Sequence, residues 1–192
     1  PLRSLFVYAY VGMTLPLRSA FTRGQCRRHQ APIALLYYHR VADSHPTPWS
    51  IDRATFRTQI DWLARRFDLV GLAEAQRRIV AGNDRPCVTL TFDDGYQENA
   101  QWAIPWLIER RIPVTYYVST GFIGRDLGFP HDVALGLNLA THDPATLRSW
   151  VGTSIEFGGH TRTHADLGRC HDLDRLVDEL VIATADLQRL LG

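Results

Sequence analysis

Short apolar runs rich in β-branched and aromatic residues alternate with longer segments of helical periodicity along this chain. The short runs predict buried strands at residues 34–38, 87–92, 113–119 and 154–157. Apolar residues at helical spacing predict helices at residues 56–67, 72–81, 97–110 and 172–191. Because strands alternate with helices, we expect an α/β fold with a parallel sheet or barrel.

Three segments carry more specific expectations. Pro105 lies inside the helix expected at residues 97–110 and predicts a kink there, because proline removes a backbone donor. Residues 124–152 contain two prolines and several glycines, so we expect a long loop with some helix. The last helix is expected to carry one apolar stripe, made of Leu173, Leu176, Leu180, Ala183, Leu187 and Leu190.

The composition suits one packed domain. The 192 residues are 45% hydrophobic and 21% charged, which argues against disorder. Lys plus Arg total 21 against 20 Asp plus Glu, and a net charge of +1 argues against a nucleic-acid partner, which would need a clear basic excess. The three cysteines match neither a zinc ribbon nor a redox pair. The sequence does not indicate an oligomeric state.

Residues 1–30 are interpreted as a separate N-terminal segment, and residues 31–192 as the domain itself. The segment contains an apolar run at residues 5–16, which is shorter than the roughly 20 apolar residues that cross a bilayer. A buried helix and the tail of a signal segment are both open, and membrane association is left open without support. A basic cluster at Arg23, Arg27 and Arg28 is expected to be solvated.

Two adjacent carboxylates, Asp93 and Asp94, directly follow the strand expected at residues 87–92 and precede Gly95. One interpretation is an ordinary turn, since Asp-Gly is common turn chemistry. The other is a functional site, because a glycine lets the backbone bend sharply and aims neighbouring side chains differently. One carboxylate could then face a cation while the other faces a reacting group.

Two histidines, His160 and His164, follow the strand expected at residues 154–157. Side chains four residues apart on a helical turn share a face, so both imidazoles could reach one metal ion. A pair of solvent-facing or capping histidines is an equally open interpretation.

Taken together, the two motifs favour a metal site. Both lie after expected strands, and in parallel α/β folds active groups gather in the loops at the strand C-termini. One carboxylate and two imidazoles form the three-ligand pattern of catalytic zinc sites, which leaves a position for water or substrate. The sequence therefore predicts a divalent-metal site built from one of these two aspartates together with His160 and His164.

Two further places could contribute to a cleft. His39 ends an expected strand and could face the cleft, but a hydrogen-bonded structural histidine is the favoured interpretation. His131 and Asp132 lie in the long loop and could contact substrate, but a solvated pair is favoured there. No substrate-binding residue is assigned.

The paired motifs resemble the polysaccharide deacetylase family, also called the NodB-homology domain of carbohydrate esterase family 4. The segment from Thr91 to Tyr96 (TFDDGY) matches its T-F-D-D-G motif, and the segment from His160 to His164 (HTRTH) matches its H-(S/T)-x-x-H motif. YYHRV at residues 37–41 resembles the family's Y-H-R-V strand, and TYYVS at residues 115–119 its T-F-F-V strand. The resemblance covers about residues 31–192.

The resemblance implies a partial distorted (β/α) barrel of the NodB-homology type with its closing strands missing. It also implies a metal-dependent hydrolase that removes N- or O-linked acetyl groups from a polysaccharide or sugar conjugate. Asp93 would be the general base for a metal-activated water. Asp94, His160 and His164 would hold one divalent ion, usually zinc, with cobalt, nickel or manganese as substitutes.

The chain also departs from the family pattern. Later motifs, which supply a groove wall, a group that orients the base and a histidine acid, do not follow the second motif here, and His171 comes too early to replace the acid. We therefore expect a C-terminally truncated domain. A catalytically incomplete glycan-binding module or fragment, and a relative acting on other amides, are the alternatives. The glycan is left open, and the substrate class suggests the cell envelope.

Overall fold

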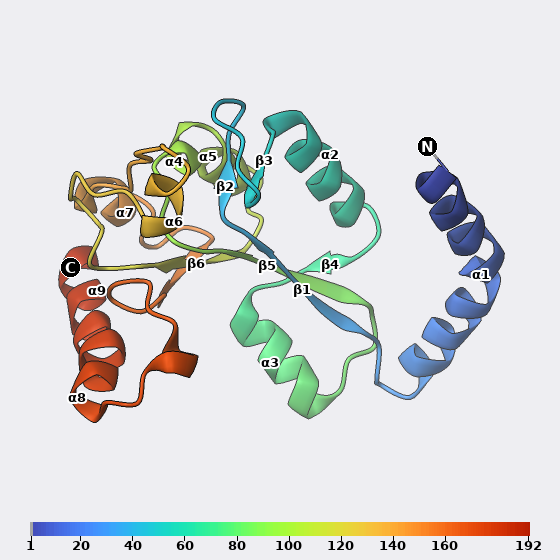
Figure 1. Ribbon diagram of the computed structural model, residues 1–192. Helices are drawn as coiled ribbons and strands as arrows, with labels where there is room; N and C mark the ends of the chain where they lie inside the picture. Colours follow the sequence, from blue (N-terminus) through green and yellow to red (C-terminus); the bar gives the residue numbers. More distant parts are fainter. Residues whose placement is uncertain (1) are drawn as a thin grey trace.

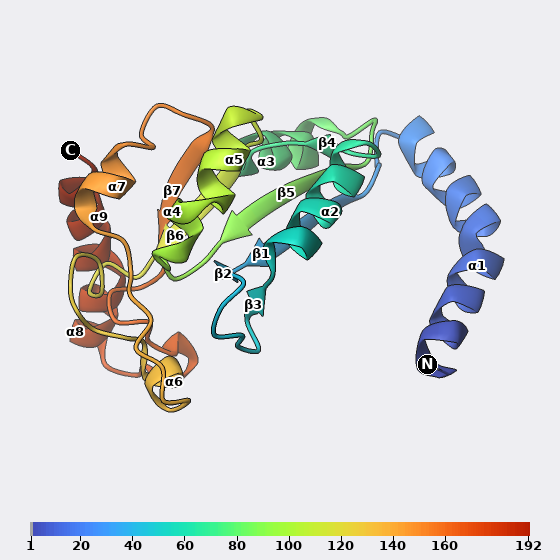
Figure 2. The same ribbon diagram turned by 90° about the horizontal axis from the view of Figure 1, so that it is seen from above.

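The computed structural model describes residues 2–192 and contains one five-stranded parallel sheet (Figures 1 and 2). Its main strands follow the order β1 (Ile33–Tyr38), β5 (Cys87–Phe92), β6 (Val114–Val118) and β7 (Ile155–Gly159). The short β4 (Asp68–Leu69) pairs with the start of β5, whose end pairs with β6. A separate two-stranded ladder joins β2 (Arg40–Val41) to β3 (Ser50–Ile51).

Helices follow most of the strands, as the alternating sequence pattern predicts. They are α1 (Leu2–Arg27), α2 (Arg53–Ala64), α3 (Leu72–Ala81), α4 (Glu98–Gln101), α5 (Ala103–Glu109), α6 (Pro130–Val133), α7 (Pro144–Arg148), α8 (Leu173–Leu176) and α9 (Ala183–Leu191). A 3-10 turn (η1, Leu167–Arg169) precedes α8, and a π-helical segment (η2, Val177–Ile182) joins α8 to α9. No helix among residues 2–192 is long and apolar enough to cross a membrane.

The hydrophobic core lies between the sheet and the helices α2, α5 and α9. It contains Phe56 and Ile60 from α2, Leu90 and Phe92 from β5, Ile104 and Leu107 from α5, and Leu187 from α9. Burial of this apolar surface is the main force that holds the helices on the sheet. Asp52 begins α2 by accepting a hydrogen bond from the backbone N–H of Thr55 at 2.8 Å, which is standard N-cap chemistry.

The opposite face of the sheet is open near β1. Leu35 and Tyr37 are 52% and 66% exposed, so the expectation that this strand is buried was wrong for these side chains. The cause is position: β1 ends the sheet order, and alternate side chains of a strand point to opposite faces. Among residues 2–192 no strand closes the sheet into a barrel, which agrees with the predicted partial (β/α) barrel of NodB-homology type.

The helix expected at residues 97–110 is interrupted in the turn before Pro105, as this proline predicts, and the interruption is a full break. Trp102 has non-helical backbone angles and separates α4 from α5, while Pro105 lies in the first turn of α5. Proline has no backbone N–H to donate to the carbonyl four residues before it, here that of Gln101. The helical hydrogen-bond pattern is therefore interrupted at Gln101. Pro105 itself is tolerated, because the first N–H groups of a helix need no intrahelical acceptor.

The predicted apolar stripe of the last helix is only partly correct. Ala183 and Leu187 are buried, whereas Leu173 and Leu180 are exposed. The side chain of Glu179 is buried in place of Leu180. The π-helical segment explains the difference, because its wider turn rotates the side chains relative to an α-helix. The N-terminal apolar run is helical, but the interpretation of a buried helix was wrong for the side chains that the structure describes there, which are exposed or half-buried.

Candidate active site and metal centre

The aspartate half of the site is built by β5. All six residues of this strand are buried, and the chain turns sharply where it leaves the sheet. Asp94 has a positive φ of 75° and Gly95 one of 103°, both in the left-handed region. The turn sends the Asp94 side chain inward, where it is 1% exposed.

The histidine half is built by β7. His160 follows the strand, and its backbone N–H donates to the Val118 carbonyl at 2.9 Å. The turn from His160 to His164 is not helical, so the reasoning from helical spacing was wrong: Thr161 and His164 have positive φ angles of 60° and 58°. Both imidazoles nevertheless reach the same place, with ring centroids 5.2 Å apart.

A buried carboxylate from the π-helical segment holds this turn. Glu179 Oε2 accepts hydrogen bonds from the backbone N–H groups of Arg162 at 2.9 Å and Thr163 at 2.8 Å. Its other oxygen accepts one from the Thr163 hydroxyl. Glu179 thus accepts the hydrogen bonds that backbone carbonyls would accept if this turn were helical. The Arg162 side chain pairs with Asp178 at 2.6 Å and Asp186 at 3.0 Å, which fastens the turn to the same helix.

Asp94, His160 and His164 converge on one point. Their candidate ligand atoms all lie within 4.8 Å of one another, and the Asp94 Oδ1 atom is 3.4 Å from Nε2 of His160 and 3.2 Å from Nε2 of His164. Neither Asp94 oxygen has a hydrogen bond of acceptable geometry among the described residues, although both are buried. A buried carboxylate without partners is costly, so this donor set fits a divalent cation.

The electrostatics of the three side chains agree with that arrangement. Burial alone would raise the pKa of Asp94, but the nearby His164, His39 and His160 bring its pKa below the usual value. The contact with Asp94 raises the pKa of His164, whereas burial lowers the pKa of His160. The ionised carboxylate is therefore the stable form, and it attracts positive charge.

Asp93 lies beside this cluster and outside it. Its half-buried side chain lines a shallow pocket of about 450 Å³ together with Tyr37, Thr91, Tyr117 and His160. Burial raises the pKa of Asp93 to about 6, with a further increase from Asp94, while His39 lowers it. A carboxylate with a pKa near 6 is a better proton acceptor than one at the ordinary value of about 4.

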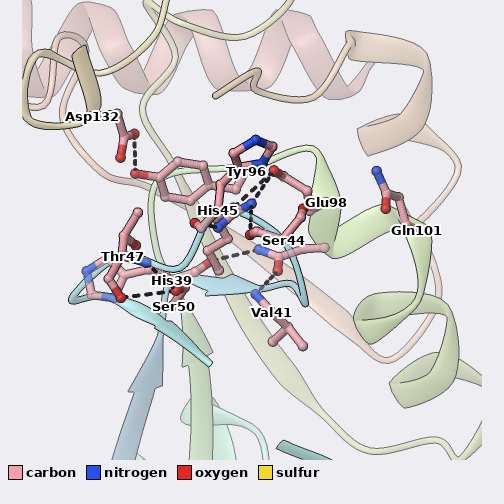
Figure 3. A network of polar contacts seen from close by, with 12 residues as sticks. His39, Val41, Ser44, His45, Thr47, Ser50, Tyr96, Glu98, Gln101 and Asp132 are labelled. Carbon is pink, nitrogen blue, oxygen red and sulfur yellow. Dashed lines mark hydrogen bonds and ion pairs between the residues drawn. The ribbon is translucent and has the colours of Figure 1, made fainter. Parts of the chain in front are cut away.

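A polar network fixes the segments that carry His39 and Asp93 (Figure 3). Asn99 donates to the His39 carbonyl at 2.7 Å and accepts from the Val41 N–H at 2.9 Å. The fully buried Arg40 side chain donates to Glu98 at 2.7 Å and 3.0 Å. Because Glu98 and Asn99 lie in α4, the network joins the chain after β1 to the chain after Asp93 and Asp94.

The loop at α6 contributes a second polar cluster beside the histidines. Asp132 is fully buried and accepts a hydrogen bond from the Tyr96 hydroxyl at 2.8 Å, so the interpretation of a solvated pair was wrong for this residue. His131 lies 2.9 Å from the same hydroxyl, and its ring centroid is 5.2 Å from that of His164. Tyr96 lies only two residues after Asp94, so it connects the loop to the aspartate turn.

Two of these contributors were missed in the sequence. Glu179 was hidden because the apolar pattern of the last helix points to Leu180, one residue further on. His131 was named in the sequence with a solvated position favoured, since its contacts are to Tyr96 and His164, more than thirty residues away on either side. The only local signal at α6 is Pro130, which lies at the first position of a short helix.

Comparison with known proteins places this chain in a family. The structure is similar to that of IcaB from Ammonifex degensii, with a TM-score of 0.66 and 26% sequence identity over 83% of this chain and 70% of IcaB. It is also similar to a de-N-acetylase from Aggregatibacter actinomycetemcomitans, with a TM-score of 0.65 and 17% identity over 83% of this chain and 75% of that one.

A polysaccharide deacetylase from Bacillus cereus shares the fold as well, with a TM-score of 0.61 and 20% identity over 83% of this chain. The match covers 48% of that protein, so the chain spans about half the length of the Bacillus proteins it matches. Residues 81–192, more than half of the chain, match the sequence model of the polysaccharide deacetylase family. By this sequence match and the shared fold, the chain belongs to the polysaccharide deacetylase family.

Proposed function

We propose that this chain is the metal-dependent part of a hydrolase that removes N- or O-linked acetyl groups from a polysaccharide or sugar conjugate. One observation carries the proposal. Asp94 from the end of β5 meets His160 and His164 from the end of β7, and Asp93 stands beside them at the edge of an open pocket. Family membership supplies the substrate class.

Asp94, His160 and His164 would hold the ion. A carboxylate and two imidazoles suit zinc best, with cobalt, nickel or manganese as alternatives. When bound, a divalent ion supplies Lewis acidity, which acidifies a coordinated water and polarises the acyl carbonyl. The donor atoms are already close together, so little rearrangement of the chain is needed for binding.

Asp93 would act as the general base. Its carboxylate is close to the metal ligands without being one of the three convergent donors, and its pKa of about 6 leaves it ionised yet basic at neutral pH. In that role it takes the proton of the attacking water. The neighbouring pocket, lined by Tyr37 and Tyr117, offers aromatic surface for a sugar ring.

The substrate also suggests the location. Because the substrate class is an envelope or extracellular polymer, we place the activity in the cell envelope. The acetylated glycan itself is the only partner that the site requires.

The test is acetate release from an acetylated chito-oligosaccharide by the zinc-loaded protein. Asp93→Asn should retain zinc and lose about 10²–10⁴-fold in rate, the usual cost of removing a general base. If Asp93→Asn strips the metal, the division of labour between the two aspartates is wrong. If the wild-type protein binds zinc and the oligosaccharide but releases no acetate, the chain is a glycan-binding module instead.

A further inference from the structure

Helix α1 presents a large apolar surface that the rest of the described chain does not cover. Phe6, Met13, Leu17 and Phe21 are between 69% and 76% exposed. Figures 1 and 2, taken from perpendicular directions, both show α1 standing away from the sheet and the helices that pack on it. Side chains of this size at such exposure are unusual on a soluble surface and mark an interaction site.

The charge of α1 is as unusual as its apolar surface. Residues 1–30 contain five of the 21 arginines and none of the 20 acidic residues. The rest of the chain therefore carries 16 arginines against 20 acids and is negative, although the whole chain is nearly neutral. Arg18, Arg23 and Arg27 are exposed and form no ion pair within residues 2–192.

The two properties are separated along the helix axis. No charged residue lies between Arg3 and Arg18, a stretch of 14 residues, and four arginines follow at positions 18, 23, 27 and 28. At about 1.5 Å per residue, 14 helical residues extend ~21 Å. One leaflet of a bilayer has a hydrocarbon depth of about 15 Å, half of the ~30 Å core.

We propose that α1 binds the surface of a membrane that contains anionic lipids. The uncharged stretch is longer than one leaflet is deep, so it enters that leaflet at a tilt that keeps Arg3 near the interface, while the arginines at its C-terminal end pair with phosphate headgroups. Arginine matches phosphate geometry through bidentate hydrogen bonds, so it suits this position. The negative remainder of the chain is repelled by the same headgroups, which leaves α1 as the point of attachment.

The attachment also determines how the proposed catalytic site is oriented relative to the membrane. α1 leads into the start of β1, whereas Asp93 and Asp94 follow the end of β5, which runs parallel to β1. The site therefore lies at the end of the sheet away from α1 (Figure 1). A membrane-bound protein would present its pocket away from the bilayer, toward a polymer in the surrounding layer.

Vesicle co-sedimentation tests the proposal directly on the full chain, without zinc or substrate, so that the result is independent of the proposed activity. Wild-type protein should bind vesicles of phosphatidylglycerol and phosphatidylcholine and bind pure phosphatidylcholine much less. Four substitutions to glutamine at the arginines 18, 23, 27 and 28 should weaken partitioning to the anionic vesicles by roughly 100-fold or more, because each arginine near the surface contributes about fivefold.

A charge-matched variant provides the control. It carries glutamine at four exposed arginines of the catalytic domain, Arg65, Arg111, Arg125 and Arg169, and should bind the anionic vesicles like the wild type. Phe21→Ser with Leu17→Ser should weaken binding while the charge is unchanged. Equal losses in both arginine variants, or no wild-type binding, would overturn the proposal. So would lipid-independent dimerisation by sedimentation velocity that the two serine substitutions abolish, since α1 would then be a self-association surface.

Discussion

The two halves of the candidate site are held by different means. β5, which is followed by Asp93 and Asp94, is buried at every position and pairs with β1 on one side and with β4 and β6 on the other. β7, which is followed by His160, lies last in the sheet order and is only partly buried. Its turn depends on polar contacts with Glu179 and the helix behind it.

The aspartate half is therefore fixed by hydrophobic packing, whereas the histidine half is fixed by hydrogen bonds to a carboxylate that is distant in the sequence. Packed strands open rarely, whereas a turn held by a few polar contacts opens more easily. We therefore expect Asp94 to be in place before any ion binds, and the two histidines to be the part that an ion makes rigid.

The largest effect should come from removing one ligand from each half. Asp94→Ala and His164→Ala should each weaken zinc binding by more than about 100-fold, since even the loss of an outer partner of a metal ligand costs about 10–100-fold. Calorimetry on both variants measures the affinity. His171→Ala removes a histidine outside the cluster and should change nothing. Unchanged zinc affinity in either ligand variant would remove that half from the metal site.

A smaller effect should distinguish the two halves. Glu179→Ala should weaken zinc binding about 10–100-fold by releasing the histidine turn. Hydrogen exchange of the Arg162 and Thr163 amides should become faster, while the amides of β5 keep their protection. Glu109→Ala, at an exposed position of another helix, is the matched control. Faster exchange in β5 as well would show that Glu179 supports the whole fold and not the turn alone.

The smallest effect concerns the aspartate half without metal. Folding raises the pKa of Asp93 from 3.8 to about 6, so the folded protein holds this proton more tightly than the unfolded chain between those values. The free energy of unfolding therefore decreases as the pH rises from 3.8 to about 6, because the carboxyl group becomes ionised in the folded protein. The full decrease is present above about pH 6.

In the presence of a chelator, Asp93→Asn should be more stable than the wild type by about 1–2 kcal/mol at pH 8, after allowance for partial exposure. Near pH 3.5 the two proteins should be equally stable. Urea unfolding at both pH values measures the difference. A stabilisation that is the same at both values would mean that the amide packs better for reasons unrelated to charge.

Much of this fold was predictable because its signals are local. The β-branched run at residues 87–92 predicted β5 with its observed bounds. The helical pattern at residues 72–81 likewise predicted α3. Donor chemistry and position after strands pointed to the two histidines and one of two aspartates, the family resemblance selected Asp94, and the structure brings the three residues together. Their roles in holding an ion are still a prediction.

The rest depended on contacts between distant residues. No residue near Glu179 in the sequence indicates that its carboxylate accepts hydrogen bonds from a turn sixteen residues earlier. The π-helical segment that directs this side chain inward also has no recognisable hydrophobic pattern in the sequence. The burial of Asp132 depends on Tyr96, and the exposure of Leu35 depends on the sheet ending at β1. Short apolar runs predict strands, but not which of their faces is covered.

The parallel pairing of the sheet has a consequence for the order in which the molecule assembles. Ile33 pairs with Cys87 and Val114 with Ile155, so every main strand must wait for a partner that lies far along the chain. Closing such long loops is slow, because chain entropy is lost before the contacts form. During synthesis β1 and β5 can pair first, whereas β7 and Glu179 leave the ribosome later. The ion-binding cluster is thus completed only after the aspartate half has formed, and a metal ion would be captured by a sheet that already contains β5.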